Sequence, residues 1–194
     1  MKIKVTFFGI LMLASLIATK SYLSLVALLA ALLHEIGHLC VARACNVPIK
    51  ELRFDIFGAS ITPKESFSSY KKEIAVALGG PLVNIVCFVI LLPFLKAQSE
   101  ILNLFLATSA FLGLLNLLPI EGFDGGRVIY CTVALVSTAE SADKAISFLS
   151  VLCLFSLWML SVYLMIRTGG SISMFVFSFA LLCKIFVNQK NKIE

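Results

Sequence analysis

The sequence predicts an all-α polytopic membrane protein of about six transmembrane helices, with a small β-hairpin between the second helix and the third. Three observations predict this class. Of the 194 residues, 60% are hydrophobic, the mean hydropathy is +1.01, and only 14% are charged, whereas about a quarter of a soluble domain is charged. The length suits one domain, and we expect residues 1–194 to form it.

The candidate spans follow from length, because a helix that crosses the hydrocarbon needs about 20 apolar residues. The apolar segments are 5–19, 22–41, 74–95, 101–120, 145–166 and 171–187. The six cysteines include no C-x-x-C pair. We therefore expect small buried apolar residues rather than a disulfide framework.

Lysine and arginine predict the orientation, because the cytoplasmic flanks of spans carry an excess of both. With the N-terminus inside, cytoplasmic segments hold thirteen of the sixteen, and external loops hold only Lys20, Lys96 and Arg167. We therefore expect a multi-pass protein of the cell membrane with both termini in the cytoplasm. The net charge of +5 reflects these flanks and requires no nucleic-acid partner.

The segment 49–63, IKELRFDIFGASITP, has the alternation of a strand. Leu52, Phe54 and Ile56 alternate with polar residues, and this period of two predicts a strand. Gly58 is expected to turn the chain back into a second strand; the alternative is an ordinary surface loop. The free edge of such a hairpin can pair with an extended peptide, so these three residues are candidate substrate-binding residues.

The second span carries the motif HEIGH. His34 and His38 are the only histidines, and at a spacing of four they lie on one helix face, about 5–6 Å apart at Cβ. That spacing suits two imidazoles on one metal ion. Glu35 lies about 100° around the helix, so it can reach a water on that metal without being a ligand. H-E-x-x-H on a helix is typical of zinc hydrolases. A structural cluster is disfavoured, because each ionised group in a span costs about 2.5–3.5 kcal/mol.

A third metal ligand must be a carboxylate or a cysteine, because catalytic zinc usually has three protein ligands and no third histidine exists. Asp124, in LLPIEGFDGGR, is the best placed. Pro119 is expected to end the preceding helix, and Gly125 and Gly126 are expected to let the backbone turn sharply. Asp124 as a plain turn residue, or Glu121 as the ligand, are the alternatives. The expected topology puts this segment and the histidines at the cytoplasmic side.

Together, HEIGH, GGPLVN and NLLPIEGFDGG resemble the motifs of the site-2 protease family of intramembrane zinc metalloproteases. They are most similar to the branch of stage IV sporulation protein FB. Asn84, Asn116 and Asp124 stand at the positions of that family's G-P-x-x-N and N-x-x-P-x-x-P-x-D-G motifs, whereas Gly122 stands where the second proline is common. The resemblance covers about residues 1–190, and we expect neither a CBS domain nor a PDZ domain.

The resemblance implies a zinc metalloendopeptidase with one Zn²⁺ per chain, held by His34, His38 and Asp124, and with Glu35 as general base. Its substrate would be a membrane-embedded or membrane-associated regulatory protein, cleaved in regulated intramembrane proteolysis. Regulatory membrane proteins and the lipid bilayer are further expected partners, and the active site would lie toward the cytoplasm. Asn84 and Asn116 are further candidate substrate-binding residues.

Three alternatives are open. Asn84 can instead join two helices through hydrogen bonds. A zinc transporter can carry a similar HE-x-x-H stretch, but transport needs several ligands along a path, and this chain has no further histidine. A scaffold that keeps zinc without catalysis would have no need of Glu35.

Overall fold

The computed structural model describes residues 2–5, 21–55, 58–63, 69–97, 99–168 and 179–180. The chain divides into two compact units, Met1–Leu117 and Leu118–Glu194. The expected spans 5–19 and 171–187 lie almost wholly outside the described residues, so the count of six spans stays a prediction.

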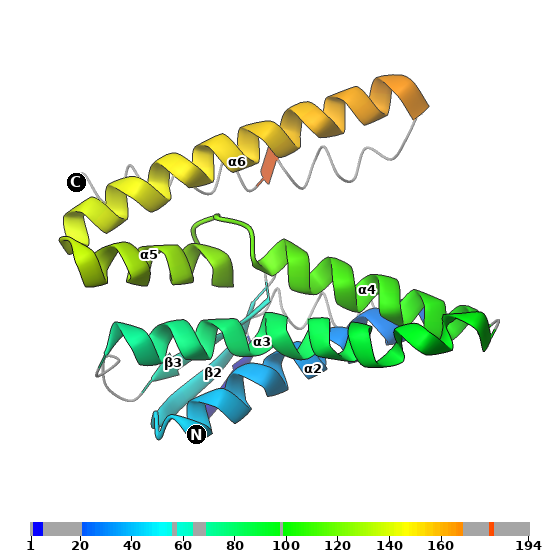
Figure 1. Ribbon diagram of the computed structural model, residues 1–194, viewed down its shortest axis with the longest axis horizontal. Helices are drawn as coiled ribbons and strands as arrows, with labels where there is room; N and C mark the ends of the chain where they lie inside the picture. Colours follow the sequence, from blue (N-terminus) through cyan, green and yellow to red (C-terminus); the bar gives the residue numbers. More distant parts are fainter. Residues whose placement is uncertain are drawn as a thin grey trace. The chain divides into compact units, whose positions relative to one another are not determined.

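Three helices form the body of the first unit: α2 (Tyr22–Ala44), α3 (Tyr70–Leu91) and α4 (Glu100–Asn116). They pack against one another (Figure 1), and a short 3-10 helix, η1 (Leu92–Ala97), follows α3. Each α-helix begins after a serine whose hydroxyl accepts a hydrogen bond from a main-chain N–H of the first turn; these caps are Ser21, Ser69 and Ser99. Such caps satisfy N–H groups that have no partner within the helix.

Helix α2 has an outer apolar face and an inner face of small and polar residues. Its buried residues are Val26, Ala30, His34, Gly37, His38 and Ala42. Its large apolar side chains point outward, and Leu25, Leu29, Leu32 and Ile36 are each 45–60% exposed. This distribution is the reverse of a soluble amphipathic helix and suits a helix that has lipid outside.

Within the described residues, three helices are long and apolar enough to cross a membrane: Tyr22–Ala44, Tyr70–Phe94 and Ala139–Arg167. The apolar helix Glu100–Asn116 is shorter. The sequence predicted a fourth span to residue 120, but α4 ends at Asn116, because the chain turns before Pro119. These apolar helices indicate a membrane protein.

Helices α2 and α3 meet at two glycines. A Cβ on Gly79 would lie 2.8 Å from the carbonyl oxygen of Gly37, and a Cβ on Gly37 would collide with the carbonyl oxygen of Gly79. The two backbones are therefore in direct contact. Such close approach is the usual basis of helix association in a membrane, where burial of apolar surface drives little.

A three-stranded sheet of order β1-β2-β3 completes the first unit. Strand β1 (Lys2–Val5) pairs parallel with β2 (Ile49–Asp55), and β2 pairs antiparallel with β3 (Gly58–Pro63). Strands β2 and β3 lie where the sequence predicted a hairpin. The role given to Gly58 was wrong, because Gly58 pairs with Asp55 and belongs to the ladder.

The sheet also corrects the expected position of the free edge. Leu52 pairs with Ile3 on one side and with Ile61 on the other, so β2 is the central strand. Its main-chain groups are used on both sides, and the outer strands of the described sheet are β1 and β3. Ile56, the third predicted hairpin residue, lies outside the described residues.

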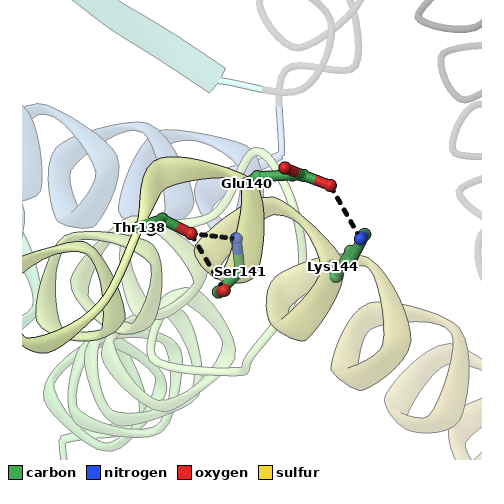
Figure 2. A network of polar contacts seen from close by, with 4 residues as sticks. All are labelled: Thr138, Glu140, Ser141 and Lys144. Carbon is green, nitrogen blue, oxygen red and sulfur yellow. Dashed lines mark hydrogen bonds and ion pairs between the residues drawn. The ribbon is translucent and has the colours of Figure 1, made fainter.

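The second unit contains α5 (Asp124–Val136) and α6 (Ala139–Thr168), which pack against each other. Helix α5 was not predicted as a separate element. Ile120 and Leu154 form the core, with further apolar residues around them: Leu118, Phe123, Val151, Cys153 and Leu157. Near the start of α6, the Thr138 hydroxyl accepts from the N–H of Ser141, and Lys144 pairs with Glu140 at 2.8 Å (Figure 2).

Candidate metal centre

His34 and His38 lie on the inner face of α2 and are 5% and 7% exposed. Their rings are nearly perpendicular, with centroids 4.8 Å apart. The two Nε2 atoms face each other at 3.2 Å. The helical spacing predicted from the sequence therefore does bring both imidazoles to one point.

The tautomer of His38 follows from its contact with α3. Its Nδ1 lies 2.7 Å from the carbonyl oxygen of Val76, so Nδ1 carries the proton and donates it. The N–H of Gly80 is 3.3 Å from the same nitrogen, but a protonated Nδ1 has no lone pair to accept from it. Nε2 of His38 is therefore the atom with a lone pair, and it points toward His34.

The Nδ1 of His34 faces the side chain of Asn84, also on α3. The carboxamide nitrogen of Asn84 lies 3.4 Å from this Nδ1, and Asn84 is only 1% exposed. Both imidazoles thus meet α3 through Nδ1 and meet each other through Nε2.

Gly80 lies against both imidazoles. A Cβ there would be 2.7 Å from Nε2 of His34 and would collide with Nε2 of His38. Only a glycine leaves the space into which the two nitrogens point. Pro81 follows and is fully buried. No role was predicted for Gly80, although GGP inside a membrane span is a small-residue signal of close helix approach.

The donor geometry fits a metal ion. Two nitrogens at 2.0–2.1 Å from a tetrahedral zinc are about 3.3 Å apart, and the two Nε2 atoms are separated by 3.2 Å. Hydrogen bonding at the outer ring nitrogen is typical of metal-ligating histidines, because it fixes ring orientation. Glu35 follows His34 directly on α2 and is half-buried.

In the second unit, Asp124 is the first residue of α5 and is half-buried. Phe123 precedes it as the N-cap and supplies no side-chain cap. A carboxylate in the first helical turn is also stabilised by the helix dipole, which is an independent reason for an aspartate here. The predicted ligand role stays a prediction.

The predicted turn at Gly125 and Gly126 was wrong, because both lie within α5. The turn instead occurs at Gly122, whose φ is +97°. Proline cannot adopt this angle, since its ring fixes φ near −65°. Gly122 therefore changes the path of the loop at the position where the resembling motif has proline. Gly126 has another role: a Cβ there would collide with the carbonyl oxygen of Ile120.

Ser150 of α6 fixes this loop and was missed by the sequence analysis. Its buried hydroxyl accepts from the N–H of Glu121 at 2.7 Å and donates to the carbonyl oxygen of Pro119 at 3.4 Å. No motif marks Ser150, because its partners are main-chain atoms 29 and 31 residues away.

The other predicted substrate-binding residues lie on different elements. Asn116 ends α4, and its amide donates to the carbonyl oxygen of Leu112 in the same helix at 3.0 Å. Leu52 and Phe54 lie in the central strand β2. Their substrate-binding roles stay predictions.

Comparison with known proteins bears on these features. The family model of peptidase family M50 matches residues 22–101. A protein of Synechocystis sp. that is named as a zinc metalloprotease is 30% identical over 102 residues, covering 50% of this chain and 27% of its own length. A zinc metalloprotease of Methanocaldococcus jannaschii is 28% identical over 165 residues, covering 76% of this chain and 45% of its own.

Among solved structures, the site-2 protease from Methanocaldococcus jannaschii matches with a TM-score of 0.70 at 19% identity, over 94% of this chain and 88% of that one. The chain therefore has the site-2 protease fold. It spans less than half the length of the two matched relatives. The chain is thus similar to peptidase family M50 over residues 22–101 and to two proteins named as zinc metalloproteases.

Proposed function

From the similarity to peptidase family M50 over residues 22–101, we propose that this chain is an intramembrane zinc metalloendopeptidase that cleaves a membrane-embedded or membrane-associated regulatory protein. The convergence of the two buried Nε2 atoms at 3.2 Å, on a helix that carries Glu35 between them, supports this proposal most directly. The similarity of the motifs to the sporulation branch supports regulated intramembrane proteolysis.

One Zn²⁺ per chain would be held by His34, His38 and Asp124. The donor set is two neutral imidazoles and one carboxylate, which is a known composition for catalytic zinc. Such an ion lowers the pKa of a coordinated water to about 7 and polarises the scissile carbonyl. Asp124 is favoured over Glu121 because Glu121 is tied through its main-chain N–H to Ser150 and has the longer, more flexible side chain.

Glu35 would act as the general base and then as the general acid. Its carboxylate accepts a proton from the attacking water and returns that proton to the leaving amine. The Nδ1–H of His38 stays hydrogen-bonded to the Val76 carbonyl oxygen. Nε2 of His38 therefore keeps its lone pair for the metal throughout the reaction. Asn116, at the end of α4, would contact the substrate near this site.

The sheet would hold the substrate in an extended form. A helix must unwind before attack, because its carbonyls are otherwise hydrogen-bonded. Strand β2 is paired on both sides, so an added peptide strand would pair with the outer edge of β3. Leu52 and Phe54, in the central strand, would then not donate main-chain hydrogen bonds to the peptide, and Ile56 stays a candidate substrate-binding residue.

The excess of lysine and arginine in the expected inside segments supports a multi-pass protein of the cell membrane, with both termini cytoplasmic and the active site toward the cytoplasm. Regulatory membrane proteins would control the access of the substrate.

The test is Glu35→Gln, assayed for zinc content and for cleavage of a co-expressed membrane substrate. An amide cannot act as a base, so this variant should keep zinc and lose cleavage. Glu73→Gln, a change of the same type in the first turn of α3, is the matched control and should cleave normally. Undiminished cleavage by Glu35→Gln refutes the assigned role. Zinc flux into proteoliposomes without any protease substrate would favour the transporter instead.

A further inference from the structure

The two histidines are held from α3 by different kinds of group. His38 uses a main-chain carbonyl, that of Val76 at 2.7 Å, which no substitution on α3 removes. His34 instead faces a side chain, the carboxamide of Asn84 at 3.4 Å. The contact of His34 with α3 therefore depends on the side chain of Asn84, which a single substitution can remove.

Building on the proposed zinc site, we propose that Asn84 is a positioning residue that orients the imidazole of His34, and not a substrate-binding residue. When Nε2 of His34 serves as a metal ligand, its Nδ1 carries the proton. The carboxamide oxygen of Asn84 then accepts a hydrogen bond from this Nδ1–H, while its NH₂ group donates to Nδ1 in the other tautomer. A turn of 180° about the Cβ–Cγ bond exchanges the two groups, so asparagine can satisfy the ring in either tautomer.

The surroundings of Asn84 favour this role. The residue is 1% exposed, and α4 closes over it at Gly113, where a Cβ would lie 3.3 Å from Cβ of Asn84. Its side chain is therefore confined between α3 and α4 and directed at α2. A carboxamide that is buried and turned to His34 is poorly available to a substrate backbone.

The confinement also matters for metal affinity. Two nitrogens at 3.2 Å match a tetrahedral ion only while both rings keep their planes. Loss of a group that hydrogen-bonds the outer nitrogen of a metal-ligating histidine typically lowers metal affinity 10–100-fold. Asn84 should therefore affect metal binding before any substrate is present.

The experiment compares zinc affinity, by chelator competition, and the visible absorption of the Co²⁺-substituted full chain in detergent. Asn84→Leu should lower zinc affinity about 10–100-fold and change the Co²⁺ spectrum. Asn84→Asp should retain both, because a carboxylate also accepts from Nδ1–H. Ser109→Ala is the control: Ser109 is equally buried, on α4, and its hydroxyl has no hydrogen-bond partner among the described residues. It should leave both readouts unchanged.

A second measurement needs no disruptive variant. With only two histidines, ¹⁵N-histidine labelling of the zinc-loaded chain gives two rings to follow. Asn84→Asp should shift the Nδ1 signal of one ring and leave the ring bonded to Val76 unchanged. Unshifted signals, or wild-type zinc affinity and Co²⁺ spectrum in Asn84→Leu, would overturn the positioning role.

These outcomes are separable from failure of the proposed function. If the wild-type chain binds zinc, and His34→Ala abolishes binding while Asn84→Leu does not, only the role of Asn84 fails. If the wild-type chain binds no zinc, the proposed metalloprotease fails, and the role of Asn84 fails with it.

Discussion

Gly80→Ala should abolish high-affinity zinc binding while leaving the protein folded. The added methyl carbon would lie 2.7 Å from Nε2 of His34 and closer still to Nε2 of His38. Real Cβ contacts essentially never fall below 3.0 Å, so at least one ring must move. Movement of the His38 ring breaks its hydrogen bond to Val76, and movement of the His34 ring breaks its contact with Asn84. If the helices move apart instead, the contact between Gly37 and Gly79 opens.

The expected magnitudes differ for stability and for binding. Overpacking costs about 1–3 kcal/mol, and alanine restores about 1 kcal/mol of helix propensity over glycine. The net loss of unfolding free energy should therefore be about 0–2 kcal/mol. Displacement of one of three ligands should weaken zinc binding at least a hundredfold, or about 2.7 kcal/mol.

Chelator competition measures the zinc affinity, and thermal unfolding in detergent measures the stability. Ser109→Ala is the control, because Ser109 is buried in α4 and its hydroxyl has no hydrogen-bond partner among the described residues, and it should keep zinc affinity within about threefold. Wild-type affinity in Gly80→Ala would show that Gly80 does not lie against the metal site. An equal loss in Ser109→Ala would show that general loosening of the helices is the cause.

Three further predictions concern the loop, its anchor and the topology. Asp124→Asn should lower zinc affinity and cleavage severely, whereas Glu121→Gln should change each less than about tenfold; the reverse result in side-by-side assays would make Glu121 the ligand. Ser150→Ala should lower the unfolding free energy by about 1–3 kcal/mol, because it leaves the part-buried N–H of residue 121 without its acceptor. Ser156→Ala, whose hydroxyl bonds only to its own helix, should cost much less in the same thermal melt, and equal melting shifts would contradict the anchor. A reporter fused after Lys96 should read external and one at the C-terminus cytoplasmic; a cytoplasmic reading at Lys96 breaks the six-span topology.

The histidine pair was predictable from the sequence, because its geometry is set within one helix. His34 and His38 need only the 3.6-residue period to meet, and their Nε2 atoms do meet. Strand β2 was similarly visible as a period of two. In both cases the information lies within a few residues of the chain.

The features that were missed depend on pairing across long sequence separations. Neither the main-chain carbonyl of Val76 nor the hydroxyl of Ser150 belongs to any motif, and their partners are 29 to 38 residues away. The parallel pairing of β1 with β2 was hidden for the same reason. The turn was misplaced because three nearby glycines look alike in sequence, and only Gly122 has a positive φ.

The two faces of α2 have separate roles: the outer face meets the surrounding medium, and the inner face carries the histidines of the proposed metal site. Both histidines are among the inward residues, while Leu25, Leu29, Leu32 and Ile36 are 45–60% exposed on the outer face. Those four positions can therefore be changed for a different surrounding medium, for example to polar residues where this face is to meet water. Such changes would leave the inner face as it is, so the same pair of histidines could be held by a helix that faces a different solvent.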